Sequence, residues 1–154
     1  MFASEKARIQ HAFGPELIAI HHVGSTAVPG LAAKPEIDLL VEVSNHRDEA
    51  GVADFMRSLG YDRGKDLSQG HHFYRRDVNG VRTHKAHVCS TGHFQIVRML
   101  RFRDLLRGDE GLRQRYQDLK LRLEAANERG IKEYLAKKAP FIDEIIDLID
   151  TKTE

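Results

Sequence analysis

The residues along the first part of the chain predict one helix followed by two strands. Residues 2–13 have helix-forming composition up to the break at Gly14-Pro15. Residues 17–23 are rich in β-branched and apolar side chains, which predicts a short strand. Residues 37–43 form a nearly continuous apolar run, which is typical of a central strand covered on both faces. We therefore expect helices above and below that strand.

A helix is expected after the central strand, because apolar residues recur there at helical spacing. Ser44 or Asn45 can cap its start, and Gly60 stops it. The side chains that form its expected buried face are Val52, Phe55, Met56 and Leu59. The polar and turn-prone residues 61–70 then predict a loop with a short edge strand around Tyr61.

The dipeptide Asn79-Gly80 separates two strand-like segments, residues 71–78 and 81–89. Asn-Gly in a two-residue loop favours a type I′ hairpin, because both positions tolerate positive φ. Counting back from that turn predicts a polar face that pairs Val78 with Val81, Arg76 with Thr83, Tyr74 with Lys85, and His72 with His87. The opposite face pairs Phe73 with Ala86 and His71 with Val88. This second face is more apolar, so we expect it to be the buried one.

From residue 92 onward the spacing of apolar residues is helical. A first helix, with Phe94, Val97, Leu100, Arg101 and Leu105 at helical spacing, is expected up to the break at Gly108. A second extends toward Gly130, a third starts near Ile131, and a last one has Pro140 in its first turn. The pattern as a whole predicts an α/β (α+β) fold with a mixed sheet, flanking helices and a helical C-terminal half.

Composition favours one compact unit. A chain of 154 residues that is 41% hydrophobic can bury one sizeable core, so we expect a single domain with an α/β core of about residues 1–90 and a helical part of about residues 92–150. The 24 Lys and Arg nearly cancel the 23 Asp and Glu, so charge does not imply binding to nucleic acid or to a membrane. The single Cys89 cannot form an internal disulfide, and no apolar run approaches the roughly 18 residues of a spanning helix. We expect a soluble, cytoplasmic protein.

Two carboxylates stand at the mouth of the central strand. Alternation along a strand places Glu36 and Asp38 on the same face. Carboxylates so placed repel each other unless a divalent cation or a proton lies between them. Mg²⁺ prefers such oxygen ligands and completes its shell with water and substrate phosphates. The upstream turn Gly24-Ser25 can bring backbone N–H groups and a hydroxyl to a phosphate, and Lys34 can add a positive charge there.

This stretch resembles the signature of a known family. The sequence VGSTAVPGLAAKP at residues 23–35, followed by Ile37-Asp38, is similar to the GrpB family, itself similar to the nucleotidyltransferase superfamily with its Gly-Ser turn and carboxylate-x-carboxylate strand. The resemblance covers nearly the whole chain and extends to His87-Val88, residues 102–107, Tyr116, Leu119-Lys120, Tyr134, Lys138, Phe141 and Ile142. It implies a nucleotidyltransferase-like fold in which Gly24 and Ser25 hold a triphosphate, while Glu36 and Asp38 hold Mg²⁺, or Mn²⁺ in its place.

The position of the third acid is where this chain departs from the superfamily. Active members carry a third carboxylate on a neighbouring strand, and the hairpin offers His87 at about that place. The GrpB family tends to show His-x-His there, whereas this chain has Lys85-Ala86-His87. Imidazole and ammonium suit a phosphate or a softer metal better than a second Mg²⁺.

Further candidates lie on the hairpin and on the first C-terminal helix. In the predicted register His72 and His87 are cross-strand neighbours, so either imidazole is a candidate to take a proton from an acceptor, and Lys85 to steady phosphate oxygens. A solvated sheet face is the alternative interpretation. The arginines of the helix are Arg98, Arg101, Arg103 and Arg107. Arg103 is the best candidate for a nucleotide phosphate because it lies in the family-like segment, and a solvated helix face is again the alternative.

Three functions follow as hypotheses. The leading one is a nucleotidyltransferase that uses Mg²⁺ to transfer a nucleotidyl group from a nucleoside triphosphate to an unidentified acceptor. The missing third acid leaves open a degenerate protein that binds a nucleotide or a phosphorylated metabolite without turnover. The charged C-terminal helices leave open a protein-interaction module. Base specificity, acceptor and oligomeric state are not written in the sequence.

Overall fold

The computed structural model describes residues 2–31 and 36–125. The elements in chain order are α1 (Phe2–Phe13), the 3₁₀ turn η1 (Gly14–Glu16), β1 (Leu17–Val23), the 3₁₀ turn η2 (Ser25–Ala27), β2 (Ile37–Val43), α2 (Glu49–Ser58), β3 (Asp62–Arg63), β4 (His71–Val78), β5 (Val81–Ser90), α3 (Phe94–Gly108) and α4 (Glu110–Ala125). The helices expected from Ile131 and at Pro140 lie outside the described residues, as does Lys34.

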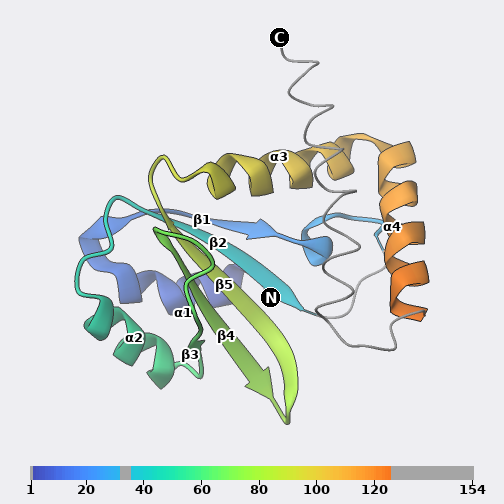
Figure 1. The fold of residues 1–154 in the computed structure, drawn as a ribbon. Helices are drawn as coiled ribbons and strands as arrows, with labels where there is room; N and C mark the ends of the chain where they lie inside the picture. The colour runs from blue at the N-terminus through green and yellow to red at the C-terminus, as the bar shows by residue number, and fades with distance from the viewer. Residues whose placement is uncertain (1, 32–35, 126–154) are drawn as a thin grey trace.

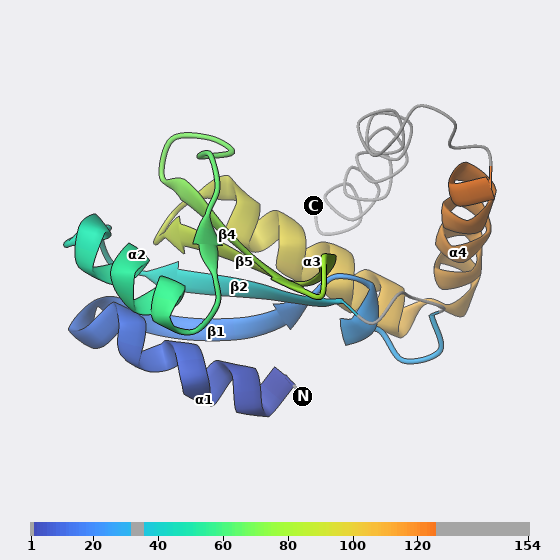
Figure 2. The same cartoon turned by 90° about the horizontal axis from the view of Figure 1, so that it is seen from below.

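The five strands form one mixed sheet in the order β1-β2-β5-β4-β3. Neighbours are antiparallel except β2 and β5, which run parallel. Helices α1 and α2 cover one face of the sheet and α3 lies over the other, while α4 stands beyond the end of the sheet where β1 stops and β2 starts (Figures 1 and 2). The predicted class, a mixed α/β sheet with flanking helices, is therefore confirmed.

The central strand β2 is buried on both faces, as its apolar sequence predicts. Leu39 is fully buried and packs in one core cluster with Ile9 of α1 and Met56 of α2. Leu40, its neighbour in sequence, is also fully buried and packs on the opposite face with Ile96 of α3. Each such side chain contributes roughly 1.5–3 kcal/mol through its burial. Because successive side chains point to opposite faces of the sheet, this one strand packs against the helices on both sides.

A third core cluster joins the segment after β1 to the last two described helices. Val28 and Leu31 pack there against Leu106 of α3 and Tyr116 of α4, and all four side chains are buried. The cluster fixes the turn between β1 and β2 from outside the sheet. Helix α4 is therefore part of the support for the Gly24-Ser25 segment.

A buried carboxylate ties α1 to the far strands. Glu5 is 5% exposed, accepts hydrogen bonds from Tyr61 Oη at 2.7 Å and from Arg8 at 2.9 and 3.1 Å, and lies 3.5 Å from Arg76. Burial and the hydrogen bond to Glu5 raise the pKa of the Tyr61 hydroxyl far above its usual value. The guanidinium groups of Arg8 and Arg76 thus balance the charge of Glu5, and the Tyr61 hydroxyl donates a hydrogen bond to it.

The helix after β2 begins later than the sequence predicts. Its cap is Asp48, at φ 50° and ψ 52°, which accepts a hydrogen bond from the Gly51 N–H at 3.2 Å. The predicted caps Ser44 and Asn45 are wrong, because the Ser44 N–H donates to the Glu16 carbonyl at 2.8 Å and continues the edge contacts of β2. Segment 44–48 consequently forms a loop before α2.

Fewer apolar side chains of α2 and α3 are buried than their helical spacing predicts. Met56 of α2 is fully buried, but Phe55 is 39% exposed. In α3 the buried side chains are Ile96 and Leu106, whereas Phe94 is 62% exposed. Helix α3 is capped by His93, whose Nδ1 accepts from the Gln95 N–H at 3.1 Å. None of the helices within residues 2–31 and 36–125 combines the length and hydropathy that crossing a bilayer requires.

The Asn79-Gly80 hairpin is confirmed, with both turn residues at positive φ of 54° and 77°. Its register departs from the prediction at the third residue from the turn. Asp77 pairs with Arg82, but Arg76 pairs with His84, so Thr83 is an extra residue on β5. Beyond such a bulge, each residue of the strand pairs one position away from its predicted partner and points to the other face of the sheet.

The bulge corrects the predicted faces of the hairpin. The predicted pairs that prove wrong are Arg76–Thr83, Tyr74–Lys85, His72–His87, Phe73–Ala86 and His71–Val88. The observed pairs that replace them are Tyr74–Ala86, Phe73–His87, His72–Val88 and His71–Cys89. Tyr74, Ala86 and Val88 join the core under α1 and α2, and Cys89 packs in the core under α3. His72 and His87 therefore lie on opposite faces of the sheet.

Candidate functional site

The two predicted carboxylates lie on the face of the sheet that α3 covers. Glu36 stands just before β2, and Asp38 alternates with the core residues Ile37 and Leu39, which face α1 and α2. Parallel pairing of β2 with β5 places Asp38 beside Lys85 and Leu40 beside His87. Two acids, a lysine and an imidazole thus share one face. The sequence predicted the two halves of this set separately, Glu36 with Asp38 and Lys85 with His87.

A lysine balances the first carboxylate. Lys85 Nζ lies 3.6 Å from Glu36 Oε2, and the two side chains are 27% and 28% exposed. An ion pair at this exposure contributes little to stability, roughly 0–1 kcal/mol. Both groups remain accessible to a ligand from solvent.

The turn after β1 touches the second carboxylate. Gly24 has φ 78° and ψ −174°, a combination that is essentially restricted to glycine. A Cβ atom at this position would lie 2.2 Å from Asp38 Oδ2 and 2.8 Å from its Cγ. Antiparallel pairing of Val23 with Asp38 brings the two segments this close. Residue 24 must be glycine for the Asp38 carboxylate to keep its position.

The rest of the turn is held from three sides. The Thr26 hydroxyl donates to the Glu36 carbonyl at 2.7 Å and lies 3.0 Å from His22 Nε2. From α4, Lys120 Nζ donates to Ser25 Oγ at 3.1 Å. Lys120 adds a cation to the Gly-Ser turn that the sequence analysis did not name as a site residue. The available signal was its place in the family-like pair Leu119-Lys120.

Two arginines of α3 hold the backbone around the same turn. Arg103 Nη1 donates to the His22 carbonyl at 3.2 Å, and its guanidinium pairs with Asp104 at 2.9 Å. Arg107 Nε donates to the Ala27 carbonyl at 2.8 Å. The Arg103 side chain is only 17% exposed, so its observed role is to fix the end of β1. Its contact with a phosphate stays a prediction.

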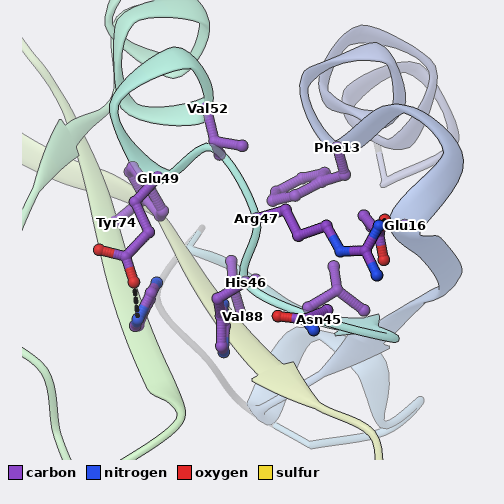
Figure 3. A pocket seen from close by; sticks show the side chains of 11 residues that line it. Phe13, Glu16, Asn45, His46, Arg47, Glu49, Val52, Tyr74 and Val88 are labelled. Atoms are coloured by element: carbon purple, nitrogen blue, oxygen red, sulfur yellow. Dashed lines mark ion pairs between the residues drawn. The ribbon is translucent and has the colours of Figure 1, made fainter.

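His72 does not join the carboxylates, because the bulge turns it toward α2. It lines a small pocket between α1, the loop before α2 and the sheet (Figure 3). There His72 Nε2 lies 3.4 Å from Glu49 Oε1, and its ring stacks on His46 with centroids 3.8 Å apart. Burial and the neighbouring His46 lower the pKa of His72. The predicted cross-strand pairing of His72 with His87 is therefore wrong.

His71 takes the place expected for His72. Its Nε2 lies 2.9 Å from His87 Nδ1, and the residue is 2% exposed. Burial, reinforced by His93 and His72, lowers the pKa of His71 to about 4. Burial, reinforced by His71 and Lys85, lowers the pKa of His87 to about 3. Sequence reasoning missed His71 because the one-residue bulge cannot be counted from the turn.

The donor set suits a Mg²⁺ ion that is shared with a ligand's phosphates. Glu36 and Asp38 supply carboxylates on one face, and the absence of a side chain at Gly24 lets the Asp38 carboxylate lie directly against the turn. Within the part of the chain that the structure describes, no group of three or more His, Cys, Asp or Glu could hold a metal ion. Mg²⁺ commonly uses one or two carboxylates plus substrate phosphates, so these residues fit that arrangement and not a metal held by the protein alone.

Comparison with known proteins connects this geometry to relatives. The family model described as "GrpB protein" matches residues 1–148. UPF0157 protein YqkA of Bacillus subtilis is 38% identical over 142 residues, which are 92% of this chain and 41% of YqkA. A UPF0157 protein of Halalkalibacterium halodurans is 35% identical over 147 residues, covering 95% of this chain and 74% of that protein. The chain thus spans well under half the length of YqkA.

Solved structures show the same fold. The crystal structure of the conserved protein GrpB from Enterococcus faecalis matches with a TM-score of 0.88 and 30% identity, over 99% of this chain and 93% of that one. The Cid1 poly(U) polymerase, solved with MgGTP bound, matches with a TM-score of 0.50 and 15% identity, over 83% of this chain and 43% of Cid1. At that identity the second likeness concerns the fold alone.

Proposed function

The chain belongs to the GrpB family, and on that premise we propose that it binds a nucleoside triphosphate with Mg²⁺ and transfers a nucleotidyl group to an acceptor. The observation that carries this proposal is the contact of the Gly24 backbone with the Asp38 carboxylate, with Glu36 on the same face. A small-residue turn and two acids meet there as phosphate and Mg²⁺ binding require. The fold is that of a polymerase solved with MgGTP, which supports a nucleotide as the ligand.

Each residue of the site has a role in this proposal. Ser25 and the backbone of its turn hold phosphate oxygens, and Lys120 brings a positive charge to the same hydroxyl. Asp38 and Glu36 orient Mg²⁺, and Lys85 balances the charge of Glu36. Bound Mg²⁺ would neutralise the charge that develops on the phosphate during transfer. Lys34 is a further phosphate ligand in the proposal, although it lies outside the described residues.

A second candidate function is nucleotide or phosphometabolite binding without transfer. The observation in its favour is that His87, which the resemblance places at about the position of the third acid, is not a carboxylate and has its Nδ1 engaged by His71. A site with two carboxylates can still hold a Mg²⁺-nucleotide. Both candidates place a phosphorylated ligand at the same residues, but the second also admits a phosphorylated metabolite and involves no turnover.

Thermal unfolding with each nucleoside triphosphate, with and without Mg²⁺, tests the shared part of the proposal. At a ligand concentration of about 100 Kd the folded protein gains about 2.7 kcal/mol. We expect a Mg²⁺-dependent rise in Tm that disappears in the double variant Glu36→Gln plus Asp38→Asn. The matched control is Glu42→Gln, a carboxylate farther along β2 that accepts a hydrogen bond from Thr91.

An unchanged response in the double variant would remove both carboxylates from the site. If no nucleotide changes the Tm of the wild-type protein, nucleotide binding itself is wrong. Release of pyrophosphate in the presence of candidate acceptors then separates a transferase from a binding protein that does not turn over.

A further inference from the structure

A pair of histidines reaches from the interior of the sheet to the edge of the proposed site. His71 on β4 and His87 on β5 are joined through Nε2 and Nδ1 at 2.9 Å. His71 is 2% exposed, and His87 is partly exposed. Lys85, two residues before His87, faces the same side and lies 3.6 Å from Glu36. His87 therefore connects the buried His71 to the group of charges around the carboxylates.

The contact between the two rings holds one proton. Burial lowers the pKa of His71 to about 4 and that of His87 to about 3, so both rings are neutral near pH 7. A neutral imidazole carries one N–H and one bare nitrogen. Either His71 donates from Nε2 and His87 keeps its proton on Nε2, or His87 donates from Nδ1 and His71 keeps its proton on Nδ1.

The remaining nitrogen of His71 distinguishes the two arrangements. His71 Nδ1 is buried and has no hydrogen-bond partner among the residues that the structure describes. If His87 donates, this atom is an unpaired N–H in the interior of the protein. If His71 donates, the same atom is an unpaired acceptor. Buried N–H groups without a partner are rarer than acceptors that are not fully satisfied, so the second arrangement is favoured.

We propose that His71 is a positioning residue that holds His87 in the tautomer with its proton on Nε2. Nε2 is the nitrogen farther from the backbone, so His87 presents an N–H donor at the outer edge of its ring. It has no free lone pair there with which to accept a proton or bind a metal. His87 then hydrogen-bonds an anionic oxygen, in particular a phosphate oxygen, beside the cation of Lys85.

This role differs from the one that the sequence analysis gave to His87. A general base needs a bare nitrogen, and a third metal ligand needs the same lone pair. The ligand part of the inference rests on the proposed nucleotide site, whereas the tautomer does not.

Long-range ¹H–¹⁵N spectra of the ¹⁵N-labelled, ligand-free chain near pH 7 test the tautomer. Protonated and bare ring nitrogens resonate in separate regions, and the signals of His87 are identified by their loss in His87→Gln. We expect a protonated Nε2 and a bare Nδ1 on His87. A bare Nε2 on His87 would overturn the inference. Because this measurement uses no ligand, it stands apart from any failure of the proposed function.

Two variants at position 71 test whether His71 sets that tautomer. His71→Gln keeps an N–H donor, and we expect it to keep Nδ1 of His87 bare. His71→Glu offers only acceptor oxygens when ionised, and we expect it to place a proton on Nδ1 of His87. The same protonation of His87 in both variants would show that His71 does not position it. If His71→Glu does not fold, the comparison of the wild type with His71→Gln still decides, because a proton on Nδ1 in the latter contradicts the proposal.

Inorganic tripolyphosphate with Mg²⁺, at matched ionic strength, probes the ligand. We expect the Nε2–H resonance of His87 to shift on titration, while the signals of His11, which is exposed on α1, stay in place. An unmoved His87 resonance in a protein that is stabilised by Mg²⁺-nucleotide would refute the phosphate contact and leave the proposed function intact. Absence of nucleotide stabilisation together with a shift by tripolyphosphate would instead identify a simple polyphosphate site around His87 and refute the proposed function.

Discussion

At the scale of single residues, the site requires that residue 24 has no Cβ atom. The backbone of Gly24 approaches Asp38 so closely that a methyl group would meet the carboxylate at 2.2 Å. A positive φ alone favours glycine, but the contact with Asp38 excludes every other residue. The Gly24-Ser25 turn and the start of β2, which our proposal assigns to phosphate and Mg²⁺ respectively, thereby lie in direct contact.

Gly24→Ala should therefore lose ligand binding as well as stability. Strain at this φ and ψ costs roughly 1–3 kcal/mol, and the displaced Asp38 should abolish the Mg²⁺-dependent rise in Tm. The matched control is Gly80→Ala, because Gly80 has nearly the same φ of 77° and open space around its Cβ position. Urea unfolding and thermal shift with nucleotide measure both effects. Equal nucleotide responses in the two variants would contradict the role given to this contact.

The parts of the site that could be predicted from sequence are the local ones. Residues 36 and 38 share a face because successive side chains of a strand point to opposite faces. This prediction uses only two nearby positions of one strand. The His71–His87 contact could not be predicted, because it depends on a bulge several residues from the turn. The contact of Lys120 with Ser25 could not be predicted either, because helical spacing carries no information on which helix meets which turn.

At the scale of elements, the hairpin of β4 and β5 decides which side chains reach the site. The turn itself forms as Asn79-Gly80 predicts, and the extra residue Thr83 then exchanges the two faces. Lys85 and His87 face α3 and the carboxylates as a result. The order and type of the helices and strands followed from apolar spacing, although α2 begins later than predicted. Pairing across strands did not follow, because one unpaired residue reverses it.

Deletion of Thr83 should be tolerated, since the residues beyond it would keep their present partners in a regular ladder. We expect a loss of about 1 kcal/mol for the hydrogen bond of its hydroxyl to the Arg76 carbonyl, with the nucleotide response retained. Deletion of Ala86, inside the paired region, is the matched comparison and should remove both folding and response. Circular dichroism, urea unfolding and thermal shift report the outcome. A Thr83 deletion that folds but loses its nucleotide response would contradict the assigned register.

At the scale of the whole molecule, the two faces of the sheet have separate tasks. The face under α1 and α2 holds the larger core and the buried Glu5, and the face under α3 holds the acids and the histidine pair. The GrpB of Enterococcus faecalis shares this fold over nearly its full length. The region of YqkA that matches this chain is 41% of its length.

The Glu5 network should affect stability without affecting the site. Glu5→Leu leaves Arg8, Arg76 and the Tyr61 hydroxyl without their carboxylate, and we expect a loss of about 3 kcal/mol in the free energy of unfolding. Tyr61→Phe removes one hydrogen bond to a charged group and should cost about 1.5–3 kcal/mol. Urea unfolding measures both, and the Mg²⁺-nucleotide shift of the folded fraction should persist. Loss of that shift in Tyr61→Phe would show that the two faces are coupled.

The hydrogen bond from Lys120 to Ser25 has a consequence for the order in which the molecule assembles. It joins positions 95 residues apart, whereas Val23 and Asp38 pair in the sheet although only 15 positions separate them in the sequence. Contacts with such long sequence separation close late, after local structure has formed. A chain emerging from the ribosome would thus hold its two acids beside the turn well before α4 arrives. The contact of α4 with the Gly24-Ser25 turn then forms late, so under the proposed function the turn gains the Lys120 cation only after the sheet has assembled.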